Sequence, residues 1–123
     1  MENFHKKSEL GRKGESVAAQ FLVNKGYRIL KRNWRFKKKE IDIIAEDDQY
    51  LVIAEVKSRT GDYGILPREM VTRKKQRYLI EAAEAYIMAY EINKACRFDV
   101  ILIFFYGGQP RLEYIPDAFH PGL

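Results

Sequence analysis

The chain has 123 residues, a mass of 14.5 kDa, 46% hydrophobic and 32% charged residues and a net charge of +5, which is typical of one globular domain over residues 1–123. The longest strongly apolar run, 100–106, is too short to span a membrane, and no apolar stretch follows the basic residues near the N-terminus. We therefore expect no membrane partner. The single cysteine, Cys96, excludes an internal disulfide, so we expect a reducing compartment, the cytoplasm.

The charges are unevenly distributed along the chain. Residues 1–39 hold 12 Lys and Arg against 3 Asp and Glu, whereas residues 40–56 hold 6 Asp and Glu and no Lys or Arg. Residues 57–77 are basic again, with 7 Lys and Arg against 2 Asp and Glu. A polyanion bound by the basic flanks would bring its phosphates near carboxylates that bind a divalent cation, although scattered solubilising charges explain the composition equally well.

The first half of the chain predicts one helix and three strands. Ser8 is a suitable N-cap for a helix over 8–25, with apolar residues at helical spacing and Gly26 after its end. Strands follow over 27–36, 40–46 and 50–57, separated by an exposed basic loop and by a polar turn. Three strands joined by short turns predict antiparallel neighbours.

The second half predicts a helix and a return to the sheet. A loop over 58–67 leads to a helix that begins at Pro67 and ends near Tyr90, followed by a buried strand over 97–105. A turn at Gly107 and Gly108 precedes a short strand over 112–115. A helix between the third and fourth strands implies a parallel crossover, so the order αβββαβ predicts an α/β fold with a mixed central sheet flanked by helices.

The two acidic strands carry ionisable side chains among apolar residues, which is unfavourable unless they are paired or bound to a metal. Strand alternation puts Glu40 and Asp42 on one face, and likewise Glu55 and Lys57. A turn of even length would bring Asp42 and Glu55 to the same face, and a four-residue turn would place them directly opposite one another. We predict this even register, because an odd one would separate the carboxylates.

These side chains have the chemistry of a Mg²⁺ site, which uses one or two carboxylates together with water and substrate phosphate oxygens. Asp42 and Glu55 would provide the carboxylates and Val56 a backbone carbonyl, while Lys57 would orient a metal-bound water or stabilise charge on a phosphate. A cross-strand salt bridge of Lys57 is the simpler alternative. Glu15, on the first helix, is either a further ligand or a solvated residue.

Several motifs occur in a fixed order along the chain: Gly11-Arg12-Lys13-Gly14-Glu15, Gly26-Tyr27, Asn33-Trp34-Arg35, Glu40-Ile41-Asp42-Ile43-Ile44, Glu55-Val56-Lys57-Ser58-Arg59, Lys75-Gln76-Arg77 and Arg97-Phe98-Asp99-Val100. Together they resemble the YraN-type family of small bacterial endonuclease-like proteins, within the PD-(D/E)XK nuclease superfamily. The resemblance covers about residues 8–119. It implies a restriction-endonuclease-like fold related to Holliday-junction resolvases.

The same resemblance implies Asp42, Glu55 and Lys57 as the catalytic core, with Glu15 as the helix-borne acid. It further implies hydrolysis of phosphodiester bonds with Mg²⁺ or Mn²⁺, and a homodimer as in the resolvase relatives. The superfamily's Pro-Asp is Ile41-Asp42 in this chain, which retains the metal-binding carboxylate.

We therefore expect a metal-dependent endonuclease acting on DNA, including branched or otherwise structured DNA. The residues expected to bind phosphates are Lys37, Lys38, Lys39, Arg59, Arg73, Lys74, Lys75, Gln76 and Arg77. Two other hypotheses remain at this stage: a nucleic-acid-binding module that does not cut, and a protein-interaction domain. By contrast, Asp99 beside Arg97 in a buried strand predicts a structural ion pair.

Overall fold

The computed structural model of the protein describes residues 7–60 and 71–121. Its helices and strands are, in chain order, α1 (Glu9–Asn24), β1 (Arg28–Phe36), β2 (Lys39–Glu46), β3 (Tyr50–Thr60), α3 (Arg73–Ala89), β4 (Ala95–Phe105) and β5 (Arg111–Phe119). The strands form one five-stranded sheet in the order β1-β2-β3-β4-β5, in which β3 and β4 are parallel and the other neighbouring pairs are antiparallel. The predicted α/β architecture, a mixed sheet flanked by helices, is confirmed.

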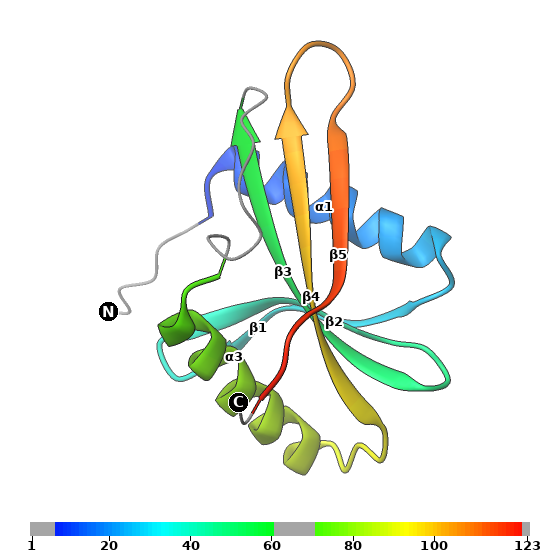
Figure 1. Ribbon diagram of the computed structural model, residues 1–123, viewed down its shortest axis with the longest axis vertical. Helices are drawn as coiled ribbons and strands as arrows, with labels where there is room; N and C mark the ends of the chain where they lie inside the picture. Colours follow the sequence, from blue (N-terminus) through cyan, green and yellow to red (C-terminus); the bar gives the residue numbers. More distant parts are fainter. Residues whose placement is uncertain (1–6, 61–70, 122–123) are drawn as a thin grey trace.

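The two helices cover opposite faces of the sheet (Figure 1). On one face, Leu22 and neighbouring α1 residues pack on Ile43 of β2 and Ile101 of β4. On the other face, Leu79 and other α3 residues pack on a second core that includes Ile44. Strands buried on both faces explain why the sequences of β2, β3 and β4 are almost continuously apolar.

The start of α3 differs from the sequence-based prediction. Pro67 lies outside the described residues, but Val71 and Thr72 are not helical, so a single helix from Pro67 to Tyr90 is wrong. The helix begins at Arg73 because the Thr72 hydroxyl accepts a hydrogen bond from the backbone N–H of Lys75 at 3.1 Å. Within the described residues, neither helix has the length and apolar character needed to cross a membrane.

Candidate active site

Asp42 and Glu55 meet where β2 and β3 separate. Ile43 pairs with Ala54, and continuing this register by one residue sets Asp42 opposite Glu55, so the predicted even register is confirmed. The regular pairing of the two strands ends at Ile43. Beyond it, Oδ2 of Asp42 accepts a hydrogen bond from the backbone N–H of Val56 at 2.8 Å. The carboxylate thus satisfies a backbone donor of the partner strand.

Strict alternation along β2, however, is wrong at Asp42. Ile41 and Ile44 both pack in the core beneath α3, whereas Ile43 packs beneath α1. Residues three apart would face opposite ways in a regular strand. The irregularity lies opposite Asn33 of β1, whose φ of 54° is in the left-handed region. The distortion gives the Asp42 side chain access to groups on the α1 side of the sheet.

Helix α1 brings Glu15 over this point of the sheet. A Cβ atom on Gly14 would lie 1.8 Å from Oγ of Ser58, so the close approach of α1 to β3 requires glycine there. Glu15 is consequently buried, and its Oε1 accepts hydrogen bonds from Nδ2 of Asn33 at 2.7 Å and Nε of Arg32 at 3.2 Å. The position of Glu15 over the sheet excludes the alternative of a solvated helix residue.

Lys7, which immediately precedes the N-cap of α1, is paired with two of these carboxylates. Its Nζ donates a hydrogen bond to Oδ1 of Asp42 at 2.6 Å and lies 3.3 Å from Oε2 of Glu15. Burial acts to lower the pKa of Lys7, but the charges of Asp42 and Glu15 outweigh it and raise that pKa. The sequence analysis did not identify Lys7, because no motif or spacing connects it with Asp42.

Glu55 is the least satisfied carboxylate of the group. It is 3% exposed, and its Oε2 lies 3.5 Å from Nζ of Lys57 and 3.6 Å from Nζ of Lys75. No described residue makes a hydrogen bond to its Oε1. Burial, and next the charge of Asp42, raise the pKa of Glu55 to about 7, although the two lysines act in the opposite direction. The two lysines therefore do not fully stabilise the ionised form of Glu55.

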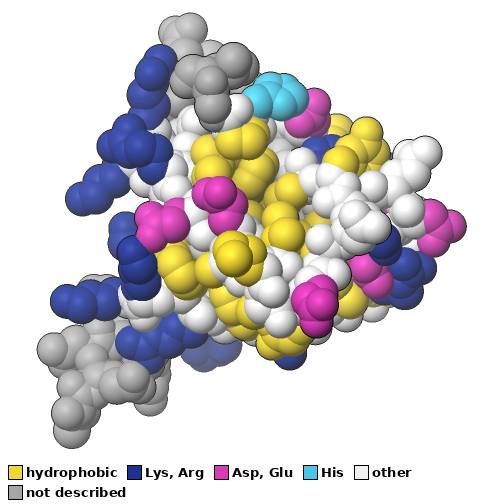
Figure 2. Space-filling view, turned by 90° about the horizontal axis from the view of Figure 1, so that it is seen from below, with side chains coloured by type: hydrophobic (Ala, Val, Ile, Leu, Met, Phe, Trp, Pro, Cys, Tyr) yellow, Lys and Arg dark blue, Asp and Glu magenta, His cyan; other side chains and the backbone are white. Residues whose placement is uncertain are grey.

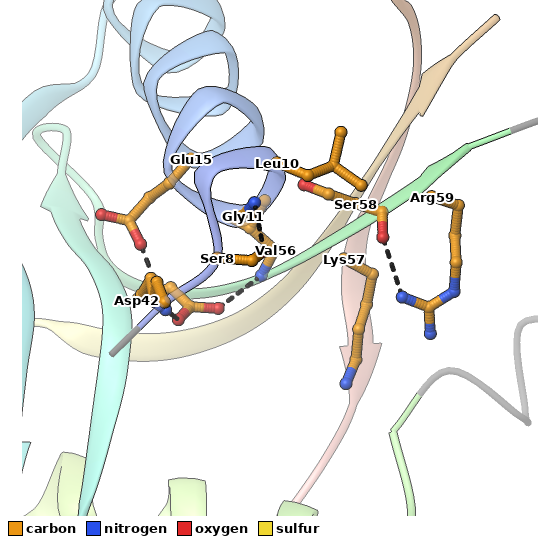
Figure 3. Close-up of a pocket in the computed structure, with 10 residues that line it drawn as sticks. Ser8, Leu10, Gly11, Glu15, Asp42, Val56, Lys57, Ser58 and Arg59 are labelled. Atoms are coloured by element: carbon orange, nitrogen blue, oxygen red, sulfur yellow. Dashed lines mark hydrogen bonds and ion pairs between the residues drawn. The ribbon is translucent and has the colours of Figure 1, made fainter. Parts of the chain in front are cut away.

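Lys7, Glu15, Asp42 and Lys57, but not Glu55, line a pocket of about 220 Å³ between α1 and the end of β3. Figure 3 shows Glu15 extending from α1 toward Asp42, with Lys57 and Arg59 on the same side of β3. Val56 also lines the pocket, and its carbonyl as a third ligand stays a prediction. The part of the chain that the structure describes contains no group of three His, Cys, Asp or Glu side chains arranged to hold a metal. Two carboxylates are nevertheless a sufficient protein contribution for Mg²⁺ or Mn²⁺ when water and phosphate complete the coordination.

The predicted phosphate-binding residues fall into two sets around this pocket. Arg59 lines the pocket itself. In the second set, the β1–β2 turn lies against α3, since Lys37 pairs with Glu81 and Nζ of Lys39 lies 5.7 Å from the ring centroid of Tyr78. The exposed members of this second set are Lys37, Lys38, Lys39, Arg73, Lys74 and Arg77. Figure 2 shows Lys and Arg side chains along its left edge, the side where α3 begins in Figure 1.

Lys75 and Gln76, which were also predicted to bind phosphate, make contacts within the protein. Lys75 points to Glu55 rather than standing on the outer surface of α3, and is half-buried. Gln76 donates a hydrogen bond from Nε2 to the carbonyl of Val71 at 3.0 Å, which holds the residue preceding the N-cap of α3. The sequence indicated both residues as surface contacts because helix periodicity does not show how close the first turn of α3 lies to Glu55.

The chain matches known sequences over most of its length. The model of Uncharacterised protein family UPF0102 matches residues 14–103. A UPF0102 protein of Chlorobium phaeobacteroides is 48% identical over 118 residues, covering 90% of this chain and 94% of the relative. A UPF0102 protein of Geobacter metallireducens is 47% identical over 119 residues, covering 95% and 96%. A third, from Flavobacterium psychrophilum, is 39% identical over 114 residues, covering 92% and 95%.

The chain belongs to the UPF0102 family. This is the YraN-type family that the ordered motifs predicted, a member of the PD-(D/E)XK nuclease-like superfamily. The five-stranded mixed sheet between two helices is consistent with the restriction-endonuclease-like fold of that superfamily. The matched region, 14–103, includes Glu15, Asp42, Glu55 and Lys57, so the candidate site lies within the part of the chain that defines the family.

Proposed function

We propose that this protein is a metal-dependent endonuclease that hydrolyses phosphodiester bonds in DNA, with branched or structured DNA among its substrates. The observation that carries the proposal is the juxtaposition of Asp42 and the incompletely satisfied Glu55 beside Lys57. Asp42 and Lys57 also line a pocket. A buried carboxylate oxygen without a partner among the described residues is unfavourable in a purely structural role and is suited to a cation.

Each residue has a separate task in the proposed reaction. Asp42 and Glu55 would hold Mg²⁺ or Mn²⁺, which would lower the pKa of a coordinated water and withdraw charge from the attacked phosphate. Lys57, 3.5 Å from Glu55, orients the attacking water and stabilises negative charge as it develops on the phosphate. Glu15 positions the groups around Asp42 through its contacts with Lys7 and Asn33.

The two sets of basic side chains bind the nucleic-acid backbone. Arg59 lies at the pocket, and the second set lies on the β1–β2 turn and the first turns of α3. Lys and Arg contacts with phosphates supply affinity without reading sequence, which suits an enzyme that recognises the shape of DNA. Binding across both sets would place a phosphodiester over Asp42 and Glu55.

The proposal is tested by cleavage of branched, duplex and single-stranded DNA with Mg²⁺ or Mn²⁺. We expect Asp42→Asn and Glu55→Gln each to lower the cleavage rate by about 100-fold or more, because both keep the side-chain shape and remove the metal-binding charge. Asp48→Asn, an exposed residue of the β2–β3 turn, is the matched control and should retain activity. Equal trace cleavage by the wild type and Asp42→Asn on every substrate would overturn the catalytic assignment.

One observation favours a second candidate, a nucleic-acid-binding module of the same fold that does not cut. Lys7 already pairs with Asp42 and Glu15, and the described residues provide no three-ligand acidic cluster. This candidate predicts DNA binding that needs no metal and survives Glu55→Gln, with a log–log salt slope near −0.9 for each phosphate contact. Metal-dependent binding or cutting would exclude it.

A further inference from the structure

The two halves of the candidate site are occupied differently. At Glu55, Lys57 and Lys75 stand 3.5 and 3.6 Å from Oε2, and Oε1 has no hydrogen-bond partner among the described residues. At Asp42, by contrast, Lys7 makes a 2.6 Å hydrogen bond to Oδ1, while Oδ2 is engaged by the backbone of Val56. Oε1 of Glu55 is therefore a buried acceptor without a partner among the described residues, whereas both oxygens of Asp42 are engaged.

Lys7 also joins two elements at the position where a cation is needed. Its Nζ lies between Asp42 of β2 and Glu15 of α1, 2.6 Å from one carboxylate and 3.3 Å from the other. Two buried carboxylates converging on one cation from different elements is the arrangement expected around a bound ion. The ammonium group supplies that positive charge from the chain itself.

The backbone at Lys7 is held by the first turn of α1. Nη1 of Arg12 donates to the carbonyl of Lys7 at 2.7 Å, and the backbone N–H of Arg12 donates to the carbonyl of Ser8 at 3.0 Å. The Ser8 hydroxyl caps the helix by accepting from the N–H of Gly11 at 3.0 Å. Lys7 thus reaches Asp42 from a defined anchor, and its four-carbon side chain can withdraw without any movement of the helix.

We propose that Lys7 is the internal counter-ion of the candidate site and that it sets the affinity of the site for divalent metal. A metal bound through Oδ1 of Asp42 and the Lys7 ammonium would lie close together and repel, so the two exclude one another. Metal binding then requires that Lys7 leave Asp42. This inference rests on the proposed metal site and specifies which group of the chain balances the charge of Asp42 before the metal binds.

The size of the effect follows from competition. If the ammonium group leaves Asp42 free in about one molecule in ten, the apparent metal affinity is about tenfold below the intrinsic one, and removing the ammonium restores it. Lys7→Gln should therefore bind Mn²⁺ about tenfold more tightly than the wild type. The metal-free variant should at the same time melt at a lower temperature, because Asp42 loses its counter-ion and Glu15 loses one of two.

The experiment compares Mn²⁺ affinity, by calorimetry and by electron paramagnetic resonance, in the full chain and three variants at one ionic strength. Lys13→Gln is the matched control, because Lys13 is exposed on α1 and lines a neighbouring groove with Arg12 and Phe105. It carries the same charge change and should stay within about twofold of the wild type. Lys7→Arg keeps the positive charge and should retain the weak affinity, which distinguishes loss of charge from loss of packing.

The outcomes separate this inference from the proposed function. Tighter Mn²⁺ binding by Lys7→Gln than by the wild type, Lys13→Gln and Lys7→Arg supports the counter-ion role. Equal or weaker binding by a folded Lys7→Gln overturns that role while leaving the metal site intact. If neither the wild type nor Lys7→Gln binds Mn²⁺, the metal site itself is wrong, and the counter-ion role is wrong with it. Circular dichroism of each variant verifies that the comparison is between folded proteins.

Discussion

Two buried carboxylates on neighbouring strands of one sheet have contrasting surroundings. Asp99 of β4 is fully engaged: Arg97 donates to its two oxygens at 2.9 and 2.8 Å, the Tyr114 hydroxyl at 2.5 Å and the Asp117 backbone N–H at 2.9 Å. We call these residues the Asp99 cluster. Glu55 of β3 is equally inaccessible, yet one of its oxygens has no hydrogen-bond partner in the described chain.

The cations that face Asp99 and Glu55 also differ in kind. The guanidinium of Arg97 makes a bidentate pair with Asp99, a rigid geometry that fixes both partners. The ammonium groups near Glu55 stand at 3.5 and 3.6 Å and end flexible side chains. A carboxylate satisfied in full serves the fold, as predicted for Asp99, whereas one left incomplete is available to a ligand.

The largest effect on stability is expected in the Asp99 cluster. Asp99→Ala leaves the half-buried guanidinium of Arg97 without its carboxylate, and breaking a buried pair in this way costs about 3–5 kcal/mol. Urea unfolding of the wild type and the variant measures this free energy. A loss below about 1 kcal/mol would show that the Asp99 cluster is not the stronger structural element.

The reactivity of the Cys96 thiol measures whether Asp99→Ala exposes the start of β4. Burial, and next the charge of Asp99, raise the pKa of Cys96 to about 12, so its thiol should react slowly with an alkylating reagent at pH 8. Asp99→Ala should speed this reaction, because it opens that end of β4 and removes the nearby charge. Asp42→Asn, at the other cluster, is the control and should leave the rate unchanged.

Much of this contrast could be predicted from the sequence. The polar turn between two apolar strands predicted an even register, and the structure has the four-residue form of it that sets Asp42 opposite Glu55. A helix between the third and fourth strands predicted the parallel pairing of β3 with β4. The proximity of Arg97 and Asp99 along one strand also gave their ion pair. These features depend on local periodicity and short connections, which a sequence displays directly.

The remaining features depend on tertiary contacts. The irregularity at Asp42 coincides with the left-handed backbone of Asn33 on another strand, which strand alternation does not anticipate. The same holds for Lys7, whose neighbours along the chain give no sign of the carboxylates that it meets. Lys75 was predicted to contact phosphate. Its pairing with Glu55 was missed, because the distance between the first turn of α3 and Glu55 is set by packing.

Packing, rather than ion pairing, should dominate the stability of the candidate site. Gly14→Ala places a methyl group 1.8 Å from Oγ of Ser58 and 3.0 Å from its Cβ, so α1 must shift away from β3. We expect a loss of about 1–3 kcal/mol, typical of overpacking, where the same change in an unobstructed helix would stabilise by about 0.5–1 kcal/mol. Thermal denaturation monitored by circular dichroism shows whether Gly14→Ala lowers or raises the stability.

A second substitution provides the control for Gly14→Ala. Ser58→Gly removes both atoms that the new methyl group would meet, so the double variant should regain stability relative to the two single variants combined. Additive losses would indicate that the close approach of α1 to β3 at Gly14 is not what constrains the helix. The candidate site would then owe its geometry to the ion pairs of Glu15.

The smallest expected effect on stability is that of Glu55→Gln. It is opposite in sign to the effect of Asp99→Ala, and it depends on pH. The pKa of Glu55 is raised from its ordinary value of 4.5 to about 7, so between these pH values the folded metal-free protein holds a proton that the unfolded chain releases. Stability therefore falls as pH rises through this window, and Glu55→Gln should relieve the loss. We expect the variant to be more stable than the wild type by about 1 kcal/mol at pH 8 and equal to it near pH 4, measured by urea unfolding with a chelator present. A variant less stable than the wild type at pH 8 would mean that Glu55, like Asp99, serves the fold.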